Sequence, residues 1–297
     1  MKISPLIKRL LATLSLVVLA MAAYLLWARP YQLTWGATSD EISRAMPGDE
    51  LAANPRFLAT RAITIDAPPE QIWPWLIQMG YGRAGYYGMD ILENAGSPRG
   101  LHSAEQILPE FQDFKVGDPV PISSVAQMKF YAIQPGQYMI WRGNEEGASG
   151  GFTWALYPID ASHTRLVNRI RWSHHWTQPG LLALDLFTEF TDHIAVREIL
   201  QGVKGRVEGH NKPFAQSTVE FAIYILALLL FLAALILLLL RPLSLRGWLA
   251  GLAAGIIWLV VWYAPLSVWV GLVLELFLLA ALFRAFRRPP QPGPPAE

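Results

Sequence analysis

Hydrophobic residues are concentrated at the two ends of the chain. Residues 10–28 contain no charged side chain, residues 221–240 are almost wholly aliphatic, and residues 247–283 form a second apolar block. About 20 helical residues cross the roughly 30 Å hydrocarbon core of a bilayer. The last block is long enough for two such helices, and Pro265 in its middle predicts where they divide. The pattern predicts four transmembrane helices, one before and three after a central region of ordinary globular composition.

The first apolar segment also has a second interpretation. Ala20, Ala22 and Ala23 are small residues near which a signal peptide could be cleaved. The apolar part of a cleavable signal is usually ~7–15 residues long, whereas residues 10–28 form a longer uninterrupted stretch. We therefore expect a membrane anchor, with a cleaved leader as the alternative.

Basic side chains flank the predicted helices in three groups that fall on one side of the membrane if the chain crosses four times. These groups are Lys2, Lys8 and Arg9; Arg241 and Arg246; and Arg284, Arg287 and Arg288. Cytoplasmic loops are enriched in Lys and Arg. The sequence therefore predicts a multi-pass protein of the cell membrane with both termini cytoplasmic and the central domain extracytoplasmic. Glu275 lies inside the fourth helix, where a carboxylate is either functional or protonated and hydrogen-bonded to a neighbouring helix.

Between the apolar ends, hydrophobic residues recur in some segments every two residues, as in strands, and in others about every 3.6 residues, as in helices. β-Branched residues predict a strand over residues 61–66, and Pro68 and Pro69 open a helix whose apolar face begins with Ile72. Further strands are predicted at residues 119–122, 129–134, 137–142, 151–158 and 164–172. A long amphipathic helix is predicted from about residue 184 to 208. This order of one strand, two short helices, several antiparallel strands and one long helix predicts an α+β domain.

Composition and motifs exclude several kinds of function. The net charge of +1 gives no reason to expect a nucleic-acid partner. The chain has no cysteine, which excludes disulfides, thiolate nucleophiles and cysteine-ligated metals. The glycines from Gly80 to Gly85 spell GxGxxG, but a helix precedes them, so a tight helix-to-helix turn is expected rather than a dinucleotide site. His174 and His175 lack a third ligand. We predict no catalytic residue, no metal and no cofactor.

Several motifs of the central region resemble the polyketide cyclase/dehydrase and lipid-transport type of the START-like (SRPBCC, Bet v 1-like) superfamily, in particular its membrane-bound bacterial members. The resemblance rests on TRAITIDAPPEQIWPWL at residues 60–76, QMG at 78–80, RAGYY at 83–87, FTW at 152–154, TRL at 164–166 and GVKGRVE at 202–208. It covers roughly residues 35–210. It implies a helix-grip domain, in which a curved antiparallel sheet wraps a long C-terminal helix around an apolar cavity. Members bind lipids, sterols, polyketides or hormones, so the fold alone does not give the function.

The predicted organisation follows from these patterns. Five parts are expected: an anchor (residues 1–29), an extension that packs on the domain (30–58), the helix-grip domain (59–212), three transmembrane helices (213–288) and a disordered tail (289–297).

Strand alternation predicts which side chains face the cavity. In the last strand Leu166, Asn168, Ile170 and Trp172 share the face that we expect to point inward. The candidate ligand-binding residues are Trp75, Tyr131, Trp141, Trp154, Asn168, Trp172, Phe187, Phe190 and His193. Alternatively, these aromatic residues simply fill a core, and His193 is a core histidine. Arg83, Asp90 and Glu93 are expected to form an ion pair between short helices, or to anchor a polar head group.

The sequence therefore favours membrane-anchored binding, carriage or sensing of a hydrophobic small molecule or lipid drawn from the adjacent bilayer. Two alternatives stay open. One is cyclase- or dehydratase-like chemistry in which Asn168, His193 or Tyr131 polarises a carbonyl. The other is a structural or interaction role with a filled core.

Overall fold

The computed structural model describes residues 3–143, 149–173, 181–242, 244–264 and 266–286. The chain forms two compact units. A membrane unit comprises Met1–Ala28 and Val219–Glu297, and the central domain comprises Arg29–Thr218. The predicted division at Pro265 and the predicted disordered tail lie outside the described residues.

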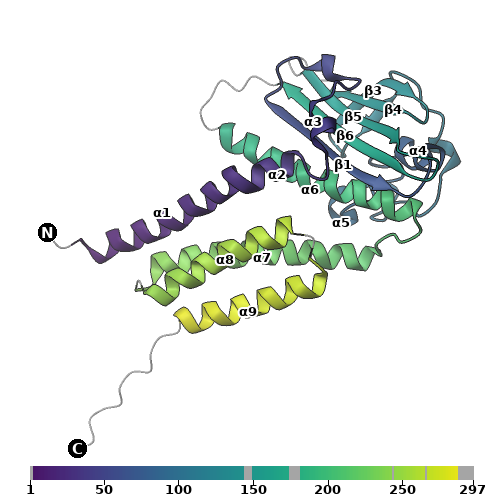
Figure 1. Ribbon diagram of the computed structural model, residues 1–297. Helices are drawn as coiled ribbons and strands as arrows, with labels where there is room; N and C mark the ends of the chain where they lie inside the picture. The colour runs from purple at the N-terminus through teal and green to yellow at the C-terminus, as the bar shows by residue number, and fades with distance from the viewer. Residues whose placement is uncertain (1–2, 144–148, 174–180, 243, 265, 287–297) are drawn as a thin grey trace, which may run out of the picture. The chain divides into compact units, whose positions relative to one another are not determined.

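The central domain consists of one antiparallel sheet and the helices that pack on it (Figure 1). The sheet has six strands in the order β1-β6-β5-β4-β3-β2. The strands are β1 (Phe57–Ile65), β2 (Pro119–Pro121), β3 (Gln127–Gln134), β4 (Tyr138–Gly143), β5 (Ser149–Pro158) and β6 (Thr164–Ser173). The helices are α2 (Arg29–Leu33), α3 (Ser39–Ser43), α4 (Pro69–Ile77), α5 (Asp90–Glu93) and α6 (Leu181–Val207), with 3-10 turns η2 (Asp49–Leu51) and η3 (Pro109–Phe111). The predicted α+β class, with a long C-terminal helix after the strands, is confirmed.

Helix α6 lies against the inner face of the sheet through a buried face that is polar towards its N-terminal end and apolar beyond it. Glu189, His193, Val196, Leu200 and Val203 are all buried, and they follow one another at spacings of four and three residues. That spacing keeps one face of a helix directed at its neighbour. The inner-face residues Leu166 and Trp154 belong to the same buried cluster as Leu200.

The outer face of the sheet is covered by the extension. Arg169 of β6 projects to this side and is 3% exposed. Its guanidinium donates hydrogen bonds to the Thr60 hydroxyl, the Asp49 carboxylate and the carbonyl oxygens of Glu41, Ile42 and Arg44. Arg165 likewise binds the Glu41 carboxylate at 2.7 Å. Between these arginines Met46 packs on Val167 and two alanines of the sheet. Charge-assisted bonds of this kind fix the extension to the strands.

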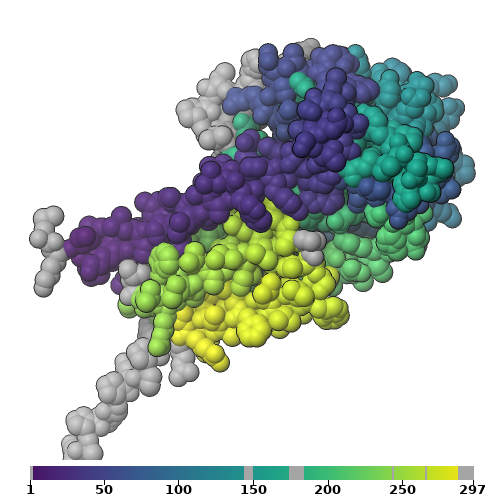
Figure 2. All heavy atoms as spheres, in the orientation of Figure 1, coloured from purple at the N-terminus to yellow at the C-terminus, as the bar shows by residue number. Residues whose placement is uncertain are grey.

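Within the described ranges, four helices are long and apolar enough to cross a membrane: Pro5–Leu33, α7 (Phe214–Leu240), α8 (Leu245–Tyr263) and α9 (Val268–Phe286). The first of them comprises α1 (Pro5–Ala23), a π-helical turn (Tyr24–Ala28) and α2. Small residues bring α8 close to its neighbours within the membrane unit, because a Cβ atom at Gly251 would meet Leu16 and Leu238. Figure 2 shows the atoms of α8 and α9 packed side by side. Glu275 of α9 is 1% exposed.

Candidate ligand-binding site

A row of three buried polar side chains crosses the inner face of the sheet. Arg61 of β1 lies directly opposite Asn168 of β6, which in turn lies opposite Trp154 of β5. Directly paired residues on neighbouring strands project to the same face. Arg61 binds Asp192 of α6, and Trp154 packs in the cluster that contains the apolar residues of α6, so this face is the inner one. Arg61 and Asn168 are 0% exposed and Trp154 is 1% exposed.

Each member of this row has a polar atom without a hydrogen-bond partner among the described residues. These atoms are Arg61 Nη2, Asn168 Oδ1 and Trp154 Nε1. The ring nitrogen of Trp141 on β4 is a fourth, and the Trp141 and Trp154 ring centroids lie 5.6 Å apart. An unsatisfied buried polar group costs about 1–3 kcal/mol, so most such groups in native proteins are paired. Their concentration on one face therefore defines a candidate site for the polar group of a ligand.

The Arg61 end of the row is strongly charged. Arg61 Nη1 lies 2.6 Å from Asp192 Oδ2, and Arg61 Nε donates to the Gln32 carbonyl oxygen at 2.7 Å. Burial raises the pKa of the Asp192 carboxyl, while the Arg61 guanidinium acts in the opposite direction. One turn earlier in α6, Glu189 binds Arg29 at 2.6 Å. This end of the site is therefore held together by ion pairs between α6, β1 and α2.

His193 lies beside this charged end and is fully buried. Burial, together with the positive charges of Arg61 and Arg197, lowers the pKa of His193 to about 2, and a hydrogen bond to the Gln32 backbone opposes the shift. Its ring lies 6.2 Å from that of Tyr31. His193 is therefore a neutral imidazole at physiological pH, as expected of a histidine in a hydrophobic stripe.

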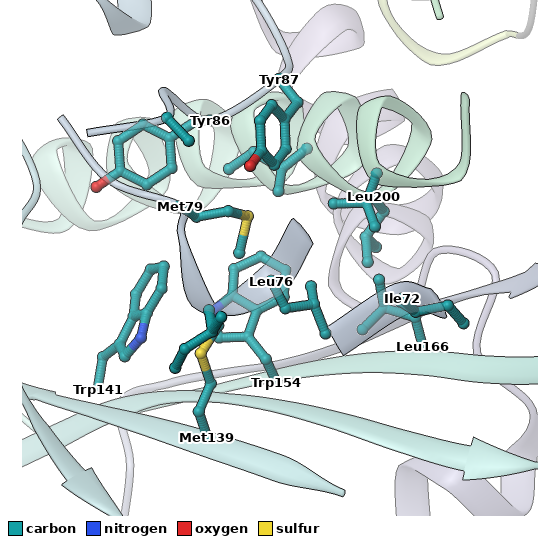
Figure 3. Packing of buried hydrophobic residues seen from close by; sticks show 14 of the residues in the cluster. Ile72, Leu76, Met79, Tyr86, Tyr87, Met139, Trp141, Trp154, Leu166 and Leu200 are labelled. Carbon is teal, nitrogen blue, oxygen red and sulfur yellow. The ribbon is translucent and has the colours of Figure 1, made fainter. Parts of the chain in front are cut away.

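The rest of the site is apolar and aromatic. Figure 3 shows Trp141, Met139 and Trp154 projecting from the strands towards Met79, Tyr86 and Tyr87. The Tyr86 and Trp141 ring centroids are 6.4 Å apart. Three methionines of this cluster (Met79, Met128 and Met139) are buried. Methionine is unbranched and repacks readily, so the interior can change shape more easily than a core of branched residues could.

Most of the predicted site residues lie in or beside this interior. Trp141, Trp154 and Asn168 are brought together on the inner face, and His193 of α6 lies buried near Arg61. Trp75 and Trp172 are half-buried and pack against the cluster from its margins. Trp75 also meets the Tyr87 ring at 5.8 Å between centroids, edge to face. Phe190 is half-buried on α6.

The inward placement of Tyr131 and Phe187 is wrong. Tyr131 is 38% exposed, because a β-bulge between Phe130 and Ala132 leaves it without a partner on β4. Phe187 is 62% exposed, because it precedes the buried Glu189 by two residues, roughly 200° around the helix. Of the three residues considered for polarising a carbonyl, Tyr131 is therefore outside the interior, whereas Asn168 and His193 are buried in it.

The expected ion pair of Arg83 with Asp90 or Glu93 is also absent from the described part of the chain. The Asp90 carboxylate instead accepts two hydrogen bonds, one from the backbone N–H and one from the hydroxyl of Ser103. Glu93 accepts the backbone N–H of Gly88 at 3.1 Å, and burial raises its pKa to about 8. The glycines around Arg83 do form the expected tight turn, because Gly80 and Gly85 exchange two backbone hydrogen bonds of 3.1 Å.

Sequence reasoning missed Arg61, Asp192, Tyr86 and Tyr87. The position of Arg61 could have been predicted from the sequence, because alternate residues of a strand share a face and Arg61 alternates with Ile63 and Ile65. Tyr87 could not be anticipated. Its backbone has a φ of 70°, and its hydroxyl donates to the Trp75 carbonyl oxygen and accepts from the Gln78 amide.

No family model matches the chain, and no curated protein matches it. Among solved structures, the chain is similar to the Zhui aromatase/cyclase from Streptomyces sp. R1128, at 14% identity over 52% of this chain and 96% of that one, with a TM-score of 0.32. It is also similar to a START superfamily protein from Mycobacterium smegmatis, at 12% identity over 51% and 97% of the two chains, with a TM-score of 0.32. A Polyketide_cyc-like protein from Corynebacterium glutamicum matches at 12% identity over 52% and 89%, with a TM-score of 0.27. At such identities and TM-scores these structures carry no argument about ligand or activity.

Proposed function

We propose that the central domain binds an apolar small molecule or lipid that carries at least one hydrogen-bonding oxygen. The ligand would lie between the sheet and α6, with its polar group on the row formed by Arg61, Asn168 and Trp154. The observation that carries this proposal is the set of buried, unpartnered polar atoms on that row. Buried polar groups in native proteins are nearly always hydrogen-bonded, so we expect the ligand to supply the missing partners.

The chemistry of the row constrains the ligand. Arg61 and Trp154 offer N–H donors, whereas Asn168 Oδ1 is an acceptor. A carbonyl or ester oxygen fits the donors, and a hydroxyl or carboxylic acid fits both kinds of group. The surrounding Met139, Leu166 and Leu200 offer only apolar contact to the rest of the molecule. A few polar groups in an apolar, aromatic wall are typical of sites for small hydrophobic ligands.

The membrane helices suggest where the ligand comes from. A domain that belongs to the same chain as apolar helices of membrane-spanning length is tethered to a bilayer, which keeps lipids at high local concentration. Carriage or sensing of a bilayer component is therefore the role that we infer. Binding of that component in the interior requires the packed side chains to move apart, and the flexible side chains of Met79 and Met139 permit this movement.

The proposal is tested by purifying the full chain in mild detergent and identifying extractable molecules by mass spectrometry. Trp154→Phe keeps an aromatic ring at this position but removes the indole N–H, so we expect the amount of retained ligand to fall about 3- to 10-fold. Trp73→Phe is the matched control, since Trp73 is a half-buried tryptophan at the margin of the cluster whose ring nitrogen is not among the unpartnered atoms, and it should retain the wild-type amount. An interior that yields no apolar molecule in near-stoichiometric amount from the wild type would contradict the proposal.

The orientation is proposed on the basis of the flanking cations, with both termini cytoplasmic and the central domain outside. Because the chain has no cysteine, single cysteines report on topology without background. Val125 is 94% exposed, so Val125→Cys should react with a membrane-impermeant maleimide on intact cells. Arg246→Cys, in the first turn of α8, should react only after permeabilisation. The reverse labelling pattern would overturn this orientation.

A further inference from the structure

A polar cleft lies on the central domain, apart from the row of Arg61. It has a volume of about 510 Å³, and Arg83, Arg99, His102, Glu105 and Gln106 contribute to its lining. Pockets for small ligands usually have about 300–1,000 Å³, so the space accommodates a polar group of substantial size. Two arginines against one carboxylate give the lining a positive balance when the histidine is neutral.

Arg83 at the inner wall of this cleft is a buried cation that no carboxylate of the described residues contacts within 4 Å, although Asp118 acts on it electrostatically from further away. The residue is 8% exposed, and burial lowers its pKa only to about 10, so the guanidinium keeps its charge at neutral pH. Nη2 donates to the Ile77 carbonyl oxygen at 2.6 Å, while Nε and Nη1 have no hydrogen-bond partner within the described ranges. A buried charge is costly unless an opposite charge and hydrogen bonds compensate it.

The surroundings of Arg83 hold its side chain in place. The mutual hydrogen bonds of Gly80 and Gly85 close the loop that carries it. A Cβ atom at Gly80 would lie 3.1 Å from Arg83 Cδ, so the glycine permits the side chain to fold over its own turn. The guanidinium carbon is 3.7 Å from the centroid of the Phe114 ring. Aromatic rings stabilise a cation on their faces but leave its in-plane donors unsatisfied.

Arg99 and His102 supply further positive or hydrogen-bonding groups at the rim. Arg99 Nη2 lies 2.7 Å from Glu110 Oε1, and both side chains are more than 40% exposed, so this pair is loose and solvated. The His102 ring packs against Phe214 with 4.2 Å between centroids. Arg99 can therefore exchange its exposed partner for an anion in the cleft, whereas His102 is held at its place.

We propose that this cleft binds an oxyanion, namely a phosphate or carboxylate group, either free or as the head group of an anionic lipid. Arg83 would donate from Nε and Nη1 in the paired geometry that guanidinium groups offer to oxyanions. Arg99 would complete the site from the rim. The site does not depend on ligand binding beside Arg61, since it shares no residue with that row.

The test measures thermal unfolding of the full chain in dodecyl maltoside, with sodium phosphate titrated against sodium chloride at matched ionic strength. A ligand that binds only the folded state raises the unfolding midpoint in a saturable way. We expect such a rise with phosphate in the wild type. Arg83→Gln should weaken the apparent affinity about 10-fold or more, and Arg99→Gln about 3-fold. Arg142→Gln, an exposed arginine of β4 outside the cleft, is the control and should respond like the wild type.

A second titration with dihexanoyl phosphatidylglycerol, kept below its critical micelle concentration, separates the two sources of the anion. A response to phosphate, alone or with the lipid, supports a site for the oxyanion itself, and a response to the lipid alone supports a head-group site. If Arg83→Gln does not fold, Arg99→Gln and ³¹P NMR line broadening of phosphate by the wild type decide the question. No response to either probe, or equal responses of the wild type, Arg83→Gln and Arg99→Gln, would overturn the proposal. Trp154→Phe should keep the phosphate response, so this outcome is separate from that of the interior site.

Discussion

Arg61 and Asp192 form an ion pair inside the fold, with 2.6 Å between Nη1 and Oδ2, although they are 131 residues apart in the chain. The pair joins the first strand to the long helix at the charged end of the inner face. Its energetic role differs from that of the exposed pairs, because a buried group that loses its ionic partner cannot be solvated by water instead.

Removing one member of this pair should be strongly destabilising. Arg61→Met leaves Asp192 without its cation, and we expect a loss of about 3–5 kcal/mol in the free energy of unfolding. The double variant Arg61→Met with Asp192→Leu should recover part of that loss, because both charges are then gone. Denaturant unfolding of the full chain in detergent measures both. Arg56→Met, which breaks the more exposed pair with Asp185, is the control and should cost at most about 1 kcal/mol.

The close approach of α6 to the Tyr87 loop predicts a sensitive glycine. A Cβ atom at Gly202 would overlap the Tyr87 carbonyl oxygen. Gly202→Ala should therefore destabilise the domain by about 1–3 kcal/mol through overpacking, despite the higher helix propensity of alanine. Gln201→Ala, its neighbour on the same helix, should change the unfolding midpoint little. An unchanged midpoint in Gly202→Ala would mean that the loop gives way.

Arg169 should control the attachment of the extension. Arg169→Lys keeps the charge but cannot make the five hydrogen bonds of the guanidinium. We expect trypsin to cleave after Arg44 several times faster in this variant, because proteolysis follows local opening. The control is Arg142→Lys, a change on an exposed part of β4, and this variant should be cleaved after Arg44 at the wild-type rate. Equal rates in all three proteins would show that other contacts hold the extension.

The buried His193 predicts a loss of stability in acid. Its pKa is lowered in the folded state, so the unfolded chain binds a proton below about pH 6.5 that the folded chain does not. The stability is therefore fully present above pH 6.5 and falls as the pH drops, with a slope approaching about 1.4 kcal/mol per pH unit from this group. His193→Gln should flatten the pH dependence of the unfolding midpoint between pH 7 and 5. His210→Gln, at an exposed position, should not.

Much of the fold follows from the chain's periodicity. The alternation in β6 correctly placed Leu166 inward and Arg165 outward, and the apolar stripes located α6 and the membrane helices to within a few residues at most ends. The largest displacement is in α7, which begins at Phe214 rather than near residue 221, because polar residues such as Gln216 and Ser217 extend the helix before its apolar part.

The parts of the site that the sequence did not yield depend on tertiary contacts. Tyr131 lies at a bulge, and one extra residue in a strand reverses the face of everything after it. Arg83 lies among carboxylates in sequence, but its turn directs it to aromatic rings and a backbone carbonyl instead. Neither a bulge nor the exit direction of a glycine loop has a local sequence signal strong enough to predict.

The alternation of charge along β6 also protects the molecule while it folds. Arg165, Arg169 and Arg171 project to the outer side, and Asn168 between them projects inward. A slip of β6 by one residue against β1 or β5 would turn all three guanidinium groups towards the apolar side chains of α6. Each would then lose both water and its partners at a cost of several kcal/mol. Misaligned hairpins are therefore too unstable to persist as kinetic traps, and a nascent sheet has only one alignment from which it can go on to close over the helix.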